Sequence, residues 1–209
     1  MPLQNRVTPE GDIVATPARG TIYGNRGGCF HRLDQTLLDR RYASKQWICC
    51  VLAFKGRRRK LRQPGLFTEL FFLDEATAFA SGHRPCFECR REDAVRYAEL
   101  WNKVEGQPGR ATAPDMDDVL HRQRTDGQRN KVSYRTRLAD VASGAMVRHA
   151  GQPCLIHNGA LRPWSFEGYG APIKTSPAIQ VDVLTPRQTV AILALGFQPK
   201  LHPSIGQEH

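Results

Sequence analysis

The stretch FFLDEATAFASGHRPCFECR, residues 71–90, predicts more of the structure than any other part of this 209-residue chain. It opens on an apolar strand, and Asp74 then stands where a helix N-cap is expected. The Ala-rich segment 75–80 is predicted to be a helix that ends near Gly82 and leads into Cys86-Phe-Glu-Cys89. Two thiolates separated by two residues at a turn can bind one ion, and zinc takes such pairs. We therefore expect a zinc site at this turn.

One Cys-x-x-Cys pair supplies only half of a tetrahedral site. Cys29 and His31 lie in a glycine-rich turn of the kind that presents ligands, so we predict that they complete the site, with His83 and His202 as substitutes. Inert thiols and a thioredoxin-like redox pair are the alternative interpretations. Such a pair opens a helix after a strand, whereas here the pair follows a predicted helix end and Pro85 precedes its first cysteine.

The other cysteines and the overall composition set the context. The start of the chain lacks the basic-then-apolar pattern of a secretory signal, and no apolar run reaches the roughly 18 residues of a membrane helix. We therefore expect a cytoplasmic protein with mostly reduced thiols. Cys49, Cys50 and Cys154 stand in apolar strand-like runs and are predicted to be core residues.

Residues 71–90 resemble the zinc-binding module at the N-terminus of Ada-type DNA alkylation-response proteins. In that family Phe-Phe, a short Ala-rich helix and Gly-(Phe/Tyr)-Arg-Pro-Cys-x-x-Cys follow in this order, four cysteines hold zinc, and one of the upstream pair takes a methyl group from a DNA phosphotriester. The resemblance implies that Cys86 and Cys89 are the downstream ligand pair. The family's upstream pair is Cys-x-x-x-Cys, whereas this turn offers Cys29 and His31. Cys29 is then the candidate catalytic methyl acceptor.

The positive charge is concentrated in one segment. The chain carries 30 Lys+Arg and 20 Asp+Glu, a net charge of +10, and residues 19–62 alone hold twelve of the cations against two acids. Arg presents a planar fork that suits phosphate, so an Arg-rich segment favours a nucleic-acid partner, with DNA preferred over RNA because of the resemblance. A solvated basic face is the alternative. The predicted phosphate contacts are Arg26, Arg57, Arg58, Arg59, Arg62, Arg84 and Arg90.

The predicted fold class is α+β, with small antiparallel sheets and short helices. We expect a flexible arm over residues 1–18, an Ada-like basic zinc module over 19–104, a linker and helix over 105–143, and a β-rich half with a terminal helix over 144–209. Residues 73–85 and 184–199 share a strand, a helix, a glycine and a proline exit. A degenerate duplication and the chance recurrence of a common element both explain this similarity.

The sequence thus predicts a zinc-containing protein that binds nucleic acid through arginines. An enzyme acting on DNA is a second hypothesis, either by methyl transfer to Cys29 or as a metal-dependent hydrolase that uses His31, Asp117 or His121. A third hypothesis is an interaction module in which zinc only supports folding.

Overall fold

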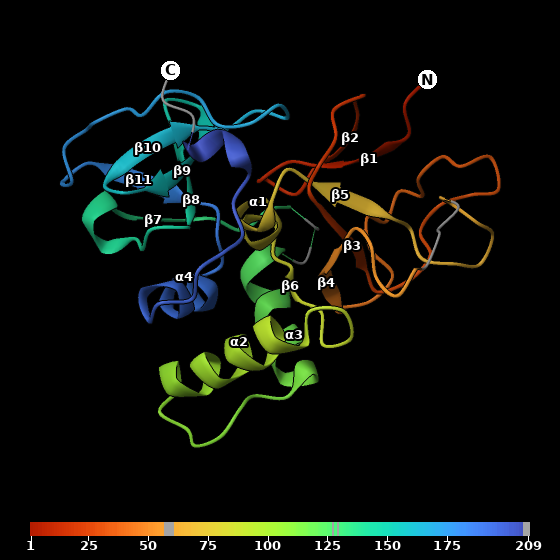
Figure 1. The fold of residues 1–209 in the computed structure, drawn as a ribbon, viewed down its shortest axis with the longest axis horizontal. Helices are drawn as coiled ribbons and strands as arrows, with labels where there is room; N and C mark the ends of the chain where they lie inside the picture. Colours follow the sequence, from red (N-terminus) through yellow and green to blue (C-terminus); the bar gives the residue numbers. More distant parts are fainter. Residues whose placement is uncertain (57–60, 127, 129, 207–209) are drawn as a thin grey trace.

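The computed structural model describes residues 1–56, 61–126, 128 and 130–206. Two small sheets lie on either side of helix α1 (Glu75–Ala80), which occupies the centre of the molecule (Figure 1). The first sheet has the order β2-β1-β5-β3-β4-β6. Its strands are β1 (Gln4–Val7), β2 (Ile13–Ala15), β3 (Ile22–Arg26), β4 (Trp47–Val51), β5 (Leu70–Phe72) and β6 (Arg84–Pro85).

The first sheet is mixed, which corrects the expectation of purely antiparallel sheets. Strand β1 pairs with β5, and β4 pairs with β6, in parallel. The second parallel pair arises because α1 carries the chain from β5 back across the sheet, so that β6 runs in the same direction as β4. Residues 4–15, expected within a flexible arm, instead form β1 and β2, because Val7 and Ile13 are buried in the core.

The second sheet is antiparallel throughout, in the order β10-β9-β8-β11-β7. Its strands are β7 (Tyr134–Arg137), β8 (Met146–His149), β9 (Gln152–His157), β10 (Ala160–Pro163) and β11 (Gln180–Val183). The predicted β-rich C-terminal half corresponds to this sheet, although β7 comes from the segment expected as a linker and helix.

The longer helices are α2 (Arg91–Val104), α3 (Ala113–Arg124) and α4 (Arg187–Ala194), and two short 3-10 turns cover Leu138–Asp140 and Pro203–Gly206. A single hydrophobic cluster joins both sheets and these helices, with Phe72, Tyr97 and Val147 among its members. Helix α1 is buried along its whole length, and Asp74 caps it by accepting a hydrogen bond of 2.9 Å from the Thr77 amide. The predicted zinc module therefore shares its core with the rest of the chain.

The two similar segments have the same local form and different neighbours. Strand β5 with α1, and strand β11 with α4, both end at a glycine with φ of +93°, Gly82 and Gly196. Strand β5 lies between one parallel and one antiparallel neighbour, whereas β11 lies between two antiparallel ones. The duplication stays a prediction.

Within the described ranges, every helix is too short or too polar to cross a lipid bilayer.

Candidate metal centre

Three cysteines from two separate segments meet at the edge of the first sheet. The parallel pairing of β4 with β6 sets Cys49 opposite Pro85, so the chain enters the Cys86 turn beside Cys50. The Sγ atoms of Cys50, Cys86 and Cys89 all lie within 4.8 Å of one another. They form the one cluster of three or more potential metal-ligating side chains in the described part of the chain. We name it the thiol cluster.

The backbone of residues 86–90 forms a tight knuckle that directs amides at sulfur. The Cys86 amide donates to the Cys49 carbonyl at 3.0 Å, which fixes the start of the turn against β4. The Arg90 amide closes the turn on the Cys86 carbonyl at 3.0 Å, and the Glu88 amide donates to Cys86 Sγ at 3.4 Å. An N–H directed at sulfur favours the thiolate, the form that binds metal.

The thiols also act on one another. A hydrogen bond from the Cys50 thiol, aided by the backbone amides of Cys89 and Glu88, lowers the pKa of Cys86 to about 5. The same Cys50 thiol, followed by the backbone of Val51, lowers the pKa of Cys89. The pKa of Cys50 is raised, because its proton is shared with Cys86 and Cys89. Two sulfurs with a lowered pKa thus surround the proton that Cys50 retains, and a cation can take the place of that proton.

The donor set fits zinc. Tetrahedral coordination at about 2.3 Å per bond places sulfurs about 3.8 Å apart, so the three Sγ atoms need only a small inward movement. Cys50 and Cys86 are buried and Cys89 is half-buried, so solvent reaches the cluster from the Cys89 side. Three thiolates fill three of four tetrahedral positions.

A buried arginine, Arg90, links the knuckle to its neighbouring elements. Arg90 follows Cys89 directly and its Nη2 atom lies 2.6 Å from Glu75 Oε1 on α1 and 2.7 Å from Asp93 Oδ2 on α2. Its Nη1 atom donates to Cys49 Sγ at 3.3 Å. Arg90 thereby ties the knuckle, both helices and β4 together.

The exposed side of the cluster opens into a hollow. Cys89 lines a cavity of about 340 Å³ together with Val51, Phe54 and the start of α2. Cys89 is the member of the thiol cluster that borders this cavity.

Cys29 and His31 lie outside the thiol cluster, which corrects their predicted role as its upstream ligands. Cys29 Sγ lies 3.7 Å from His31 Nδ1, and the His31 ring also contacts Thr68 Oγ1 at 2.8 Å and the Gln63 carbonyl at 3.3 Å. The turn that carries them pairs with the loop before β5. His83 and His202, the predicted substitutes, are also outside the cluster.

Four arginines predicted to contact phosphate are interior residues. Arg26, Arg62, Arg84 and Arg90 are each between 1% and 4% exposed. Arg62 donates to the carbonyls of Gln35 and Gln4. Long-range partners draw these side chains inward, so a surface position is corrected for all four.

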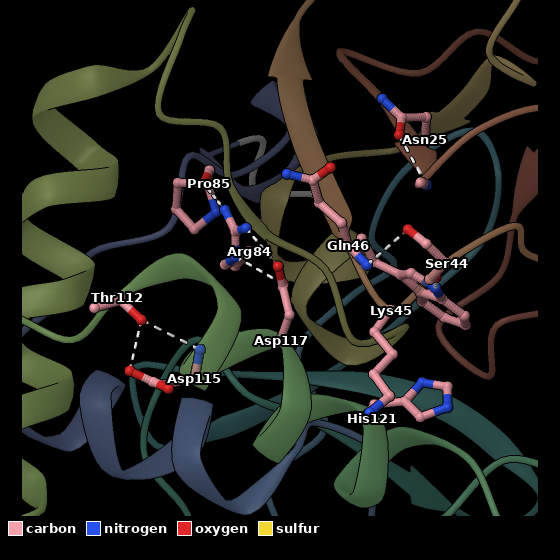
Figure 2. Close-up of polar contacts among 12 residues, drawn as sticks. Asn25, Ser44, Lys45, Gln46, Arg84, Pro85, Thr112, Asp115, Asp117 and His121 are labelled. Atoms are coloured by element: carbon pink, nitrogen blue, oxygen red, sulfur yellow. Dashed lines mark hydrogen bonds and ion pairs between the residues drawn. The ribbon is translucent and has the colours of Figure 1, made fainter.

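Arg84 forms a two-pronged ion pair immediately before the knuckle. Its Nε and Nη2 atoms donate to the two carboxylate oxygens of Asp117 on α3, at 2.9 and 2.7 Å (Figure 2). Asp117, a residue of the hydrolase hypothesis, is occupied by this pair. The His121 ring packs edge-on against the Tyr42 ring, with 5.3 Å between the ring centroids, instead of sharing a site with Asp117. Arg57, Arg58 and Arg59, also predicted to contact phosphate, lie outside the described residues.

Cys50 is the member of the thiol cluster that the sequence did not predict. Their apolar run predicts that Cys49 and Cys50 are both core residues, yet adjacent strand residues point to opposite faces. Cys49 belongs to the main core, whereas Cys50 joins Tyr23 and Cys86 on the other face. This alternation was available in the sequence and could have separated the two cysteines.

Comparisons of the chain with family models, curated proteins and solved structures find no match. The resemblance to the Ada-type module stays a prediction.

Proposed function

We propose that this chain is a zinc-thiolate protein that binds nucleic acid, preferentially DNA. The observation that carries the metal part is the thiol cluster of Cys50, Cys86 and Cys89, with Sγ atoms within 4.8 Å. The three close sulfurs, two of which have a lowered pKa, form a soft, anionic donor set. Such a set favours zinc over cations that prefer oxygen ligands.

The nucleic-acid part rests on the cations that remain at the surface. Residues 19–62 retain exposed cationic side chains after the buried arginines are removed from the predicted set: Arg19, Arg32, Arg40, Arg41, Lys45 and Lys55. Two exposed acids, Asp34 and Asp39, oppose them in the same segment. Excess positive charge of this kind attracts the phosphate backbone without reading sequence.

A second candidate function is alkyl transfer to zinc-bound sulfur, and the cavity beside Cys89 favours it. If Cys50 takes the place of the first cysteine in the family's Cys-x-x-x-Cys pair, the second place falls on Phe54, which cannot bind metal. Phe54 and Cys89 line the same cavity. In this reaction the Cys89 sulfur attacks a methyl carbon, the methyl C–O bond breaks, and a phosphodiester anion leaves. Cys89 then replaces Cys29 as the candidate acceptor.

The metal proposal is tested by zinc content in purified variants. We expect one zinc per chain in the wild type and in Cys29→Ser and Cys154→Ser, and less than a tenth of that in Cys50→Ser, Cys86→Ser and Cys89→Ser. Circular dichroism identifies variants that have lost their fold. Full zinc content in a folded Cys50→Ser variant would overturn the assignment.

The nucleic-acid proposal is tested by fluorescence anisotropy with labelled duplex DNA over a range of salt concentrations. We expect affinity to fall steeply between about 50 and 200 mM salt, and the slope to decrease in the triple variant Arg19→Gln, Arg32→Gln, Arg40→Gln. Arg110→Gln, an exposed cation between α2 and α3, is the matched control. Salt-independent binding, or equal slopes in the triple variant and the wild type, contradicts the proposal.

Methyl transfer is tested by peptide mass spectrometry after incubation with DNA that carries methyl phosphotriesters. A gain of one methyl group on Cys89 supports the candidate, and Cys89→Ser must abolish it. Unmodified cysteines after incubation exclude it without affecting the metal proposal.

A further inference from the structure

A second cavity lies on the opposite face of the β3–β4 hairpin from the thiol cluster. Arg26 and Trp47, which line it, pair across the hairpin and share a face with Cys49, whereas Cys50 points the other way. The cavity has a volume of about 330 Å³. It is surrounded by the loop between β1 and β2, by the end of α3, and by residues 130–131 of the segment that leads into β7. Its cationic lining residues are Arg26, Arg41, Arg124, Lys131 and Arg148.

The two most buried of these cations meet at one aromatic ring. The guanidinium carbons of Arg26 and Arg124 lie 4.1 and 4.0 Å from the Trp47 ring centroid. Arg26 is 2% and Arg124 is 1% exposed. The chain makes room for Arg124, since a Cβ built on Gly82 would lie 2.5 Å from Arg124 Cδ.

The hydrogen bonds of these cations end on neutral groups. Arg26 donates to the carbonyls of Gly11 at 2.9 Å and Arg41 at 3.4 Å. Arg124 donates to the carbonyls of Gly82 and Lys45.

Lys131 shows the same pattern and donates to the Ala80 carbonyl at the end of α1. The buried Nε atoms of Arg26 and Arg124 have no hydrogen-bond partner among the described residues.

The carboxylates nearby do not neutralise this group. Glu10 lies 2.6 Å from Arg148, and Asp117 is held by Arg84. Asp12 lines the cavity and acts on Arg26 at a longer range than an ion pair. Across the described residues, no carboxylate comes within ion-pair distance of Arg26, Arg124 or Lys131.

Burial and mutual repulsion disfavour the charged forms of Arg26, Arg124 and Lys131. Burial, followed by neighbouring cations, lowers the pKa of Arg26 to about 9 and that of Arg124 to about 9. Burial, together with Arg26 and Arg124, lowers the pKa of Lys131 to about 7. Buried charges without counter-charges are unfavourable for the isolated protein, and an anion in the cavity removes that penalty.

We propose that this cavity binds a small phosphate monoester, with the phosphate oxygens accepting hydrogen bonds from Arg26, Arg124 and Lys131. Arginine forks and lysine together match a tetrahedral dianion. A cavity of about 330 Å³ is larger than an inorganic phosphate ion needs and falls at the small end of ligand pockets, so the phosphate carries an organic group of about mononucleotide or sugar size. Asp12 and Glu10 at the same wall can accept hydrogen bonds from hydroxyl groups on that part. The site is separate from the thiol cluster and does not depend on the proposed function.

The test is isothermal titration calorimetry of the full chain at low salt with adenosine monophosphate, ribose phosphate and inorganic phosphate, and with adenosine as the uncharged control. We expect saturable binding of at least one phosphate monoester, weaker binding of inorganic phosphate, and no binding of adenosine. Stronger binding of ribose phosphate than of adenosine monophosphate would identify a sugar phosphate as the ligand class, and the reverse order a nucleotide.

The variants decide whether the cations form the site. Lys131→Met is expected to weaken binding roughly tenfold to a hundredfold, the effect of losing charged hydrogen bonds. Arg110→Gln is the control and should bind like the wild type. A structural role of Lys131 predicts a lower melting temperature and unchanged affinity, whereas a ligand role predicts weaker binding without loss of melting temperature. Absence of binding to all three phosphates at millimolar concentration, or wild-type affinity in Lys131→Met, would overturn the proposal.

Discussion

The two faces of the β3–β4 hairpin gather groups of opposite charge type. One face gathers three sulfurs, two of them with lowered pKa, and the other gathers three cations whose hydrogen bonds end on carbonyls. Groups of like charge repel when they are brought together away from water. We therefore propose a counter-ion of opposite sign for each face, a metal cation for the thiols and a phosphate for the cations.

A third region, around the knuckle of residues 86–90, contains buried arginines that are paired with carboxylates. Arg84 and Arg90 are as buried as Arg26 and Arg124, yet each lies within 2.7 Å of a carboxylate. Arg84 and Arg90 are thus paired with carboxylates inside the fold, whereas Arg26 and Arg124 lack such partners and are proposed to bind an anion. The following predictions test this contrast.

The largest effect is expected at the thiol cluster. Cys86→Ser removes a ligand from the centre of the knuckle, and loss of a metal is one of the few changes that destabilise a domain by about 5 kcal/mol or more. Thermal unfolding with and without a chelator measures it. The wild type should melt at a lower temperature with the chelator, and Cys86→Ser should not respond. The buried Cys154→Ser variant should respond like the wild type.

The next effect is expected at the partnered arginines. Arg90→Met leaves the buried carboxylate of Glu75 without its ion-pair partner, so we expect a loss of about 3–5 kcal/mol in the free energy of unfolding. Urea unfolding measures it. The exposed pair of Arg137 and Asp140 provides the matched control, and Arg137→Met should cost about 1 kcal/mol or less. Equal losses in the two variants would contradict the structural role of Arg90.

The third effect is expected at Lys131, and it is spread over several pH units. Its pKa is about 7 in the folded chain against 10.5 for a free lysine, so between pH 7 and 10.5 the unfolded state binds a proton that the folded state lacks. The free energy of unfolding then rises with pH over this range, by at most about 1.4 kcal/mol per pH unit from this group. Below pH 7 both states are protonated and the penalty is fully present.

Lys131→Met removes this contribution and keeps an unbranched side chain that is one atom shorter. Its stability relative to the wild type should therefore be greatest near pH 7 and fall as the pH rises. The charges that face this lysine, Arg26, Arg124, Arg148 and Glu10, are unchanged in the variant. Parallel pH profiles for the two proteins would show that Lys131 is an ordinary solvated amine.

Local signals predicted the part of the fold that local physics decides. The cap at Asp74, the helix after it and the Cys86-x-x-Cys89 knuckle all follow from residues within a few positions of one another. The strands at the start of the chain are not predicted because each spans only three or four residues, too few to show a periodicity. They exist because β5, more than sixty residues later, offers an edge for β1.

Long-range pairing decided the rest of the site. Cys50 reaches the knuckle only because β4 pairs with β6, and no spacing within the sequence reports that contact. The arginines were expected at the surface because charge is most often solvated. Arg84 and Arg90 are drawn inward by Asp117, Glu75 and Asp93, carboxylates on helices whose positions against the knuckle arise from the tertiary fold.

The most direct test of the account is X-ray absorption at the zinc edge on the purified wild-type protein. We predict one zinc per chain with three sulfur ligands at about 2.3 Å and one lighter ligand. Cys50→Ser should reduce the sulfur number or abolish binding, and Cys29→Ser should leave it unchanged. A metal-free protein, or a zinc site whose sulfur number falls in Cys29→Ser but not in Cys50→Ser, would contradict the thiol cluster as the metal centre.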